Sequence, residues 1–291
     1  MDGHNMRGTR AFAALAAVGV MGWAVSAQAQ VIAADIGKNL EYVQTGPGNV
    51  IPIGPDNAFF FGRTFYANAS DFDTGFMVAP DTTNYPYNST AFDCCGHTGG
   101  QYQTPYISRA QMDSMFPDGS GDVYQLSAVN SATTAEEDVF IEKTGSYLDS
   151  LPLPEFDSAT IAALTNRHTG PGPVVSFNNF SPDRGAFGQT FLSVFDLTQP
   201  KFFGGFVGPS DTTTSFDTSG VTLRHGHSYE MQLIFDEGQD VTNGGPQLTW
   251  RDDLRTDYFF SVAVPEPQGW AMLLLGVFGM GALLRRRRAA A

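Results

Sequence analysis

The sequence predicts a mainly β protein made of one or two antiparallel β-sandwich domains with two short helices. The chain is rich in Phe and poor in Lys, and Gly, Thr, Ser, Asn and Asp recur at short intervals, as they do where turns join short strands. Runs such as residues 123–128 and 228–236 show the two-residue periodicity of strands. An apolar segment at each end adds an N-terminal signal helix and a C-terminal transmembrane helix to the prediction.

The first 29 residues have the layout of a signal peptide. Arg7 and Arg10 precede an apolar stretch from Ala11 to Val25, and Ala27-Gln28-Ala29 fits the small-x-small cleavage rule. A buried N-terminal helix is the alternative, but the basic start and the placement of Ala27 and Ala29 favour cleavage and export. We therefore predict that residues 1–29 are a signal peptide and that Gln30 begins the mature protein.

The part of the chain between the terminal segments is strongly acidic. Residues 30–263 contain 28 Asp and Glu against 10 Lys and Arg, which gives a net charge of about −18. Such a surface repels nucleic acid and anionic lipid, so nucleic acid is not expected as a partner. The length suits one large or two small domains, each able to bury a core.

Residues 30–150 form the first predicted region, which is β-rich. Its named strands are expected over residues 57–70, 71–79, 122–130 and 138–145. One short helix is expected within residues 107–121, with Ser108 as its N-cap and with Pro117 and Gly119 ending it.

The proline-rich segment Leu151–Phe156 marks the start of the second predicted region, residues 151–263. A second short helix follows, capped by Asp157 or Ser158 and ended by Gly170 and Pro171. Five strands are expected after it, over residues 173–180, 188–197, 201–208, 212–223 and 228–236. Strands at this spacing indicate a β-sandwich.

A short motif precedes the last of these strands. Leu223, Gly226 and Tyr229 have the spacing L-x-x-G-x-x-Y, which resembles the tyrosine corner of fibronectin type III and other immunoglobulin-like sandwiches. The resemblance implies that the Tyr229 ring enters the core and that its hydroxyl hydrogen-bonds to backbone upstream. His225 and His227 lie between these positions, where we expect exposed loop histidines rather than metal ligands.

The two cysteines of the chain, Cys94 and Cys95, are neighbours. After export they can close on each other as a vicinal disulfide, or they can belong to a plain rigid loop. Metal binding helped by His97 is the alternative, but a structural zinc site needs four ligands and adjacent cysteines are a poor start. We expect the disulfide or the plain loop.

Motifs that carry catalysis are not found in the sequence. It contains no G-x-S-x-G elbow, no H-E-x-x-H helix, no P-loop and no G-x-G-x-x-G after a strand, so we expect a non-enzymatic protein with no catalytic residues. Calcium is the one cofactor considered, because Asp71 with Asp73, and Asp236 with Glu237 and Asp240, group oxygen ligands on turns. Neither group matches an EF-hand loop, and we expect these side chains to be solvated or capping.

The C-terminal segment, residues 264–291, combines three features. Residues 270–284 are an apolar run about 22 Å long as a helix, against a hydrocarbon core of about 30 Å. Four arginines, Arg285, Arg286, Arg287 and Arg288, follow it and favour the cytoplasmic side, which places residues 30–263 outside the membrane. Val264-Pro265-Glu266-Pro267 stands just before it, and its prolines enforce an extended backbone.

This segment strongly resembles a PEP-CTERM sorting domain, in which a Pro-Glu-Pro motif, an apolar helix and an arginine cluster follow in that order. The resemblance implies that an exosortase recognises Pro265-Glu266-Pro267 and processes the protein near it. It also implies that the protein comes from a Gram-negative bacterium that builds extracellular polysaccharide, biofilm or flocs.

The sequence as a whole predicts an exported cell-surface or extracellular-matrix protein with a structural or adhesive role. Its partners would be signal peptidase, an exosortase and extracellular polysaccharide, and it would be held in the inner membrane by the C-terminal helix before it reaches the surface. A carbohydrate-binding module is the alternative, with Trp250 or Tyr pairs such as Tyr85 with Tyr87 and Tyr102 with Tyr106 as sugar platforms. A secreted hydrolase is the third possibility.

Overall fold

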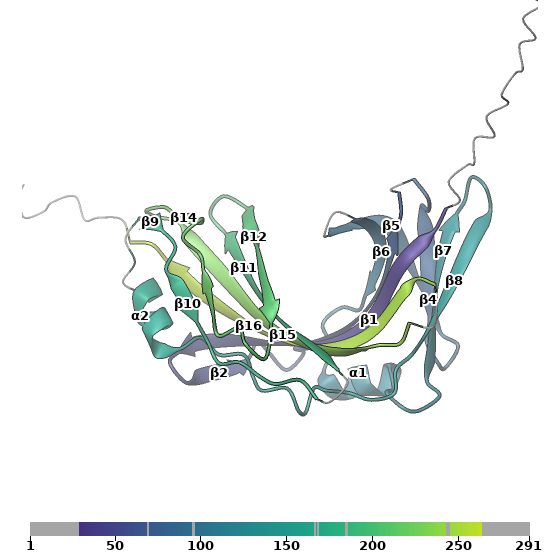
Figure 1. The fold of residues 1–291 in the computed structure, drawn as a ribbon, viewed down its shortest axis with the longest axis horizontal. Coiled ribbons are helices and arrows are strands. Elements are labelled where there is room, and N and C mark those ends of the chain that lie inside the picture. Colours follow the sequence, from purple (N-terminus) through teal and green to yellow (C-terminus); the bar gives the residue numbers. More distant parts are fainter. Residues whose placement is uncertain are drawn as a thin grey trace, which may run out of the picture.

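The computed structural model describes residues 29–263 apart from residues 69, 95–96, 166, 168, 184–185 and 243–244. Within these residues the protein is mainly β, with two short helices, as the sequence predicts. A long sheet bends into a U whose two arms stand on either side of an open middle (Figure 1).

The first half of the chain contributes eight of the described strands. They are β1 (Val31–Gly46), β2 (Asn49–Pro52), β3 (Ala58–Tyr66), β4 (Thr74–Val78), β5 (Asn84–Cys94), β6 (His97–Gln103), β7 (Val123–Asn130) and β8 (Ala135–Glu142). The second half contributes β9 (Gly170–Pro171), β10 (Val174–Ser176), β11 (Phe187–Asp196), β12 (Lys201–Pro209), β13 (Ser215–Asp217), β14 (Thr222–Leu223), β15 (Ser228–Asp240) and β16 (Gln247–Ser261).

One sheet joins the two halves of the chain. Its strands follow the order β12-β11-β15-β16-β1-β3-β6-β5-β4-β7-β8, and β2 pairs with β1. The predicted regions 30–150 and 151–263 therefore share this sheet, because β1 of the first lies against β16 of the second. β1 and β16 run through the base of the U and into both arms (Figure 1).

The pairing of β1 with β16 corrects the antiparallel prediction at the centre of the sheet. These two strands are parallel, with Ala33 opposite Gln247 and Val43 opposite Asp257. The other strand pairings described are antiparallel. A parallel pair needs a long connection, and here nearly the whole chain supplies it.

The core lies on the outer face of the bend. In the arm of β3 to β8, Phe60 stacks on Phe116 with ring centroids 4.0 Å apart and on Tyr124 at 5.3 Å. In the other arm, the alternation predicted for residues 228–236 is observed, because four side chains on one face of β15 are completely buried. They are Tyr229, Met231, Leu233 and Phe235.

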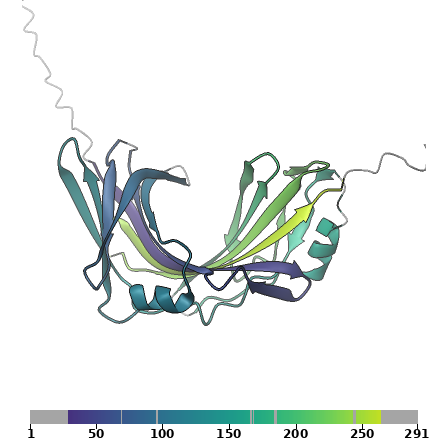
Figure 2. The same cartoon turned by 180° about the vertical axis from the view of Figure 1, so that it is seen from behind.

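The two helices begin where the sequence predicts. Helix α1 (Arg109–Met115) is capped by Ser108, whose Oγ accepts a hydrogen bond from the backbone N of Gln111 at 3.3 Å. Helix α2 (Ser158–Thr165) follows Asp157, whose Oδ1 accepts from the backbone N of Thr160 at 2.6 Å. Both views place α1 outside the base of the U and α2 outside the arm that contains β11 and β12 (Figure 1, Figure 2). Neither of these helices, in the part of the chain described, is long and apolar enough to cross a bilayer.

The hydrogen bond expected of the tyrosine corner is present. The buried hydroxyl of Tyr229 accepts from the backbone N of Arg224, five residues upstream, at 2.9 Å. The bond ties the loop before β15 to the core of that arm. The likeness to fibronectin type III that this motif suggests stays a prediction.

Candidate functional site

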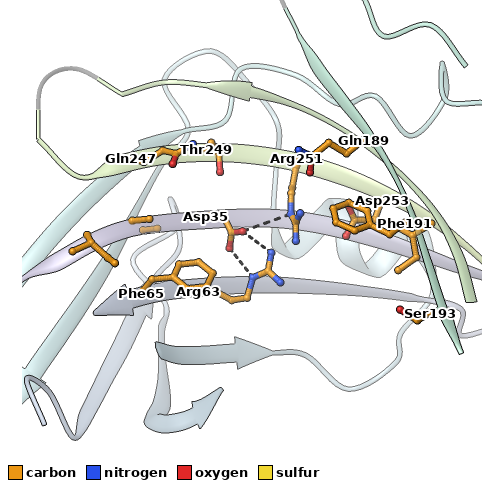
Figure 3. A pocket seen from close by; sticks show the side chains of 14 residues that line it. Asp35, Arg63, Phe65, Gln189, Phe191, Ser193, Gln247, Thr249, Arg251 and Asp253 are labelled. Atoms are coloured by element: carbon orange, nitrogen blue, oxygen red, sulfur yellow. Dashed lines mark hydrogen bonds and ion pairs between the residues drawn. The ribbon is translucent and has the colours of Figure 1, made fainter. Parts of the chain in front are cut away.

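A cavity lies on the inner face of the U, opposite α1. Its volume is about 590 Å3, and five strands, β1, β3, β11, β15 and β16, contribute to its lining (Figure 3). We call it the concave pocket. It is lined by Ile32, Ala33, Ala34, Asp35, Arg63, Phe65, Gln189, Phe191, Ser193, Ile234, Gln247, Thr249, Arg251 and Asp253.

Strand register brings charged side chains together on the floor of this pocket. Asp35 pairs with Arg63 across β1 and β3, and Asp236 pairs with Asp253 across β15 and β16, so each pair shares a face of the sheet. Arg251 lies two residues before Asp253 on β16 and therefore points to the same side. Two arginines and three aspartates thus meet where the arms join.

Each guanidinium in this group binds a carboxylate. Arg63 Nε donates to Asp35 Oδ1 at 2.7 Å, and Arg251 Nη1 donates to Asp236 Oδ2 at 2.6 Å. Arg251 Nε also lies 3.6 Å from Asp35 Oδ2 (Figure 3). Burial opposes the charge of Arg251, but Asp236, Asp253 and Asp35 raise its pKa above the ordinary value.

The aromatic ring of Phe61 packs against the guanidinium groups of both arginines. The Cζ atoms of Arg63 and Arg251 lie 4.5 and 5.3 Å from the centroid of the Phe61 ring. Gly37 makes room for that ring, because a Cβ at this position would be 2.5 Å from the Phe61 Cζ. Glycine at position 37 is therefore required for the floor of the pocket.

Asp253 has a different environment from the paired aspartates. Its side chain lines the pocket, the residue is 7% exposed, and its Oδ1 has no hydrogen-bond partner among the described residues. Burial raises its pKa, although Arg251 and Arg63 oppose the rise. Burial likewise raises the pKa of Asp236, and the nearby Asp253 carboxylate adds to this effect. Asp253 Oδ1, Asp236 Oδ1 and Arg251 Nε are therefore buried polar atoms of this group that have no hydrogen-bond partner among the described residues.

A second charged group lies further along the inner face. Arg255 donates to Glu41 and Asp257 at 2.7 Å each and to Glu230 at 3.1 Å. Tyr106 donates its hydroxyl proton to Glu41 Oε2 at 2.7 Å. Burial raises the pKa of Asp257 to about 6, against the hydrogen bond and charge of Arg255. These side chains pair with one another, so the group is structural.

A third charged group is buried in the core near the base of the U. Lys143 Nζ lies 3.0 Å from Asp252 Oδ1 and 4.1 Å from the centroid of the Trp250 ring. Lys38 Nζ donates to Asp118 at 2.5 Å and to Asp113 at 2.7 Å. Lys38, Lys143 and Asp252 have no solvent exposure, so this group also holds the fold together.

The residues predicted for calcium do not meet in one place. Asp71 accepts a hydrogen bond from the backbone N of Asn68 at 2.9 Å, and Asp73 from that of Ser131 at 2.9 Å. Asp236 binds Arg251 beside the pocket, whereas its neighbour Glu237 faces the other side of the sheet and accepts from the Asp183 N.

Asp240 accepts a hydrogen bond from the backbone N of Thr242 at 2.8 Å. Within the described residues, no three His, Cys, Asp or Glu side chains are arranged to hold a metal ion. His225 Nδ1 lies 2.7 Å from the Ala263 O and His227 Nδ1 lies 2.7 Å from Asp196 Oδ2, so these rings have separate partners.

The sorting motif from Val264 to Pro267, the predicted span over residues 270–284, the arginines from Arg285 to Arg288, and Ala27 lie outside the described residues. The proposed disulfide also lies outside them, because Cys95 is not described. Ala29, at the predicted cleavage site, is the first described residue. These predictions remain predictions.

The residues that form the concave pocket were not singled out from the sequence. A signal was nevertheless present in β16, where Arg251, Asp253, Arg255 and Asp257 recur at every second position. Charges at that spacing mark one face of a strand. Trp250, which comes just before them and was proposed as a sugar platform, is buried in the core.

No protein-family model matches this chain, and no curated protein matches it. The sequence patterns at the two ends of the chain and the concave pocket are therefore the two features on which a functional proposal rests.

Proposed function

We propose that this chain is an exported cell-surface or extracellular-matrix protein of a Gram-negative bacterium, sorted by an exosortase. The observation that carries the proposal is the order of its signals in the sequence. A signal peptide over residues 1–29 precedes an acidic passenger, and Pro265-Glu266-Pro267, an apolar run and four arginines follow it. Signal peptidase and the exosortase are its processing partners. The C-terminal helix anchors an intermediate in the inner membrane before the protein reaches the surface.

Replacing Pro265-Glu266-Pro267 with three alanines tests this proposal directly. The apolar run and the arginines are unchanged, so the variant should still insert in the membrane, but it should accumulate at full length because processing fails. Fractionation and mass spectrometry of the C-terminal peptide measure both properties. Processing and release equal to wild type would overturn the sorting proposal and leave an ordinary membrane anchor.

A matched variant separates anchoring from recognition. Replacing Arg285 to Arg288 with neutral residues keeps the Pro-Glu-Pro motif but removes the charges that stop and orient the helix. Part of this variant should pass the membrane without being anchored. The two variants should therefore differ in the membrane fraction, whereas a single defect common to both would indicate misfolding.

The passenger, in this proposal, has a structural or adhesive role in a polysaccharide matrix and is not an enzyme. Its two predicted regions would be sandwich-like arms, and the hydrogen bond between Tyr229 and Arg224 supports an immunoglobulin- or fibronectin-like second region. A panel of chromogenic esters and glycosides tests the alternative of a secreted hydrolase. Turnover of any of them would contradict the non-enzymatic role.

A carbohydrate-binding module is the second candidate, and the concave pocket favours it. Ligand sites of this size commonly combine aromatic walls with a few polar groups, and Phe65 and Phe191 line this one beside Gln189, Gln247 and Thr249. A glycan array distinguishes the two candidates. A matrix protein without a sugar site would bind none of the glycans, whereas a binding module would select a subset.

A further inference from the structure

We propose that the concave pocket binds a sugar unit that carries no negative charge, with Asp253 accepting hydrogen bonds from its hydroxyl or amino groups. This inference rests on the proposed function, because a polysaccharide matrix supplies the ligand. It deepens that function by naming the binding site and the kind of sugar that the site accepts.

The shape of the pocket suits one or two sugar units within a longer chain. Its volume of about 590 Å3 falls within the range of about 300–1,000 Å3 that is usual for small-molecule sites. The pocket is on the inner face of the U, and strands at the base and in both arms line it (Figure 3).

The walls of the pocket provide the apolar contacts that a sugar ring needs. Phe65 comes from β3 in one arm and Phe191 from β11 in the other, and Ile234 adds an aliphatic surface next to Phe191. A sugar ring has C–H groups on its faces, which can pack against such rings while its hydroxyls point outward. Gln189, Gln247, Thr249 and Ser193 lie around these walls with donors and acceptors for those hydroxyls.

Asp253 gives the pocket a specific polar anchor. A buried acceptor without a partner is costly, and native proteins normally satisfy it. Asp253 lines the pocket, is 93% buried and has an Oδ1 with no partner among the described residues. A hydroxyl or an ammonium group of a ligand in the pocket would donate to the carboxylate of Asp253 where that side chain lines the pocket.

The charge of the pocket indicates which sugars are excluded. Asp35, Asp236 and Asp253 oppose two guanidiniums, those of Arg63 and Arg251, which already bind carboxylates of the protein. An anionic sugar such as a uronate would have to compete with Asp35 and Asp236 for these guanidiniums and would bring its charge close to their carboxylates. Like charges at close range in a poorly solvated site repel strongly, so neutral and amino sugars are favoured.

The test is titration calorimetry of the whole exported protein with oligosaccharides of matched length that are neutral, amino-bearing or uronate-bearing. Neutral or amino sugars should bind at least about tenfold more tightly than uronates, which corresponds to about 1.4 kcal/mol. Asp253→Asn should weaken binding of the preferred sugar about tenfold or more, and Phe191→Ala should do the same. Phe140→Ala is the matched control, because Phe140 is 55% exposed on β8 and does not line the pocket.

The outcomes separate this proposal from the sorting proposal. A protein that is correctly processed but binds none of the three sugars overturns the sugar site alone, and equal or tighter uronate binding overturns the charge argument. Equal loss in Phe140→Ala and Phe191→Ala would place any binding elsewhere. If Asp253→Asn fails to fold, Gln247→Ala tests the same site, because Gln247 is exposed at the pocket and its loss leaves the core intact.

Discussion

Lys143 is the residue whose replacement should most clearly reveal how the arm of β3 to β8 is held against strand β16. It follows β8, and its Nζ reaches Asp252 on β16 at 3.0 Å and the Trp250 ring at 4.1 Å, with no solvent exposure. Lys143→Met keeps the aliphatic stem but leaves the Asp252 carboxylate buried without its cation. Breaking one partner of a buried pair costs about 3–5 kcal/mol. We expect about 3 kcal/mol, because Asp252 keeps hydrogen bonds from Ser146 and Tyr147.

Urea denaturation of the protein measures this loss. With a slope of about 2–3 kcal/mol per molar for a chain of this size, 3 kcal/mol shifts the midpoint by about 1–1.5 M. The double variant Lys143→Met with Asp252→Asn should recover part of the loss, because the uncompensated charge is gone. A single variant that costs less than about 1 kcal/mol, or a double variant whose cost is the sum of the two single ones, would refute the reasoning.

Three further predictions concern other parts of the molecule. Tyr229→Phe removes the hydroxyl that accepts from the Arg224 backbone and should destabilise the whole exported chain by about 1 kcal/mol, so an unchanged denaturation midpoint would contradict the corner. Burial raises the pKa of Asp257 from 3.8 to about 6. Between these two pH values the folded protein keeps this proton whereas the unfolded chain has lost it. The free energy of unfolding should therefore fall by up to about 3 kcal/mol as pH rises from 4 to 7. Thermal midpoints across this range measure the fall, which Asp257→Asn should reduce, and a midpoint that rises with pH would oppose the assignment. N-terminal sequencing of the exported protein should begin at Gln30, and an intact Met1 in the surface fraction would disprove cleavage after Ala29.

Local features of the fold could be predicted from the sequence because neighbouring residues determine them. The alternation of Tyr229, Met231, Leu233 and Phe235 correctly predicted a strand with one buried face. Ser108 was correctly predicted as a helix cap, since its side chain bonds to a residue three positions away. Ile234 is an apolar residue on the opposite face of this strand, and it lines the concave pocket, where a half-buried apolar side chain has a place.

The centre of the sheet could not be predicted, because its contacts join distant parts of the chain. Neither β1 nor β16 was identified as a long strand. In β16 the charges at Arg251, Asp253, Arg255 and Asp257 indicate exposure when taken singly. The two arginines also bind Asp35, Asp236 and Glu41, which lie on other strands and are brought close only by the fold.

The pocket was missed for the same reason. Arg63 and Arg251 are more than 180 residues apart in sequence, yet both lie over Phe61 and bind carboxylates on the floor. The terminal signals, by contrast, could be proposed from sequence, because a processing enzyme recognises a short contiguous segment rather than a folded surface.

The parallel pairing of β1 with β16 has a mechanical consequence. The described chain starts at one end of β1 and finishes at the opposite end of β16, so pulling its two ends apart drags the two strands past each other lengthwise. The hydrogen bonds from Ala33 to Val43 would then carry the load together rather than opening one after another. Force spectroscopy from the chain ends should therefore show a higher rupture force than pulling on residues 187 and 209, where the β11–β12 hairpin opens stepwise like a zipper. A protein held at its C-terminal side and pulled at its N-terminal side would resist extension at the middle of its sheet.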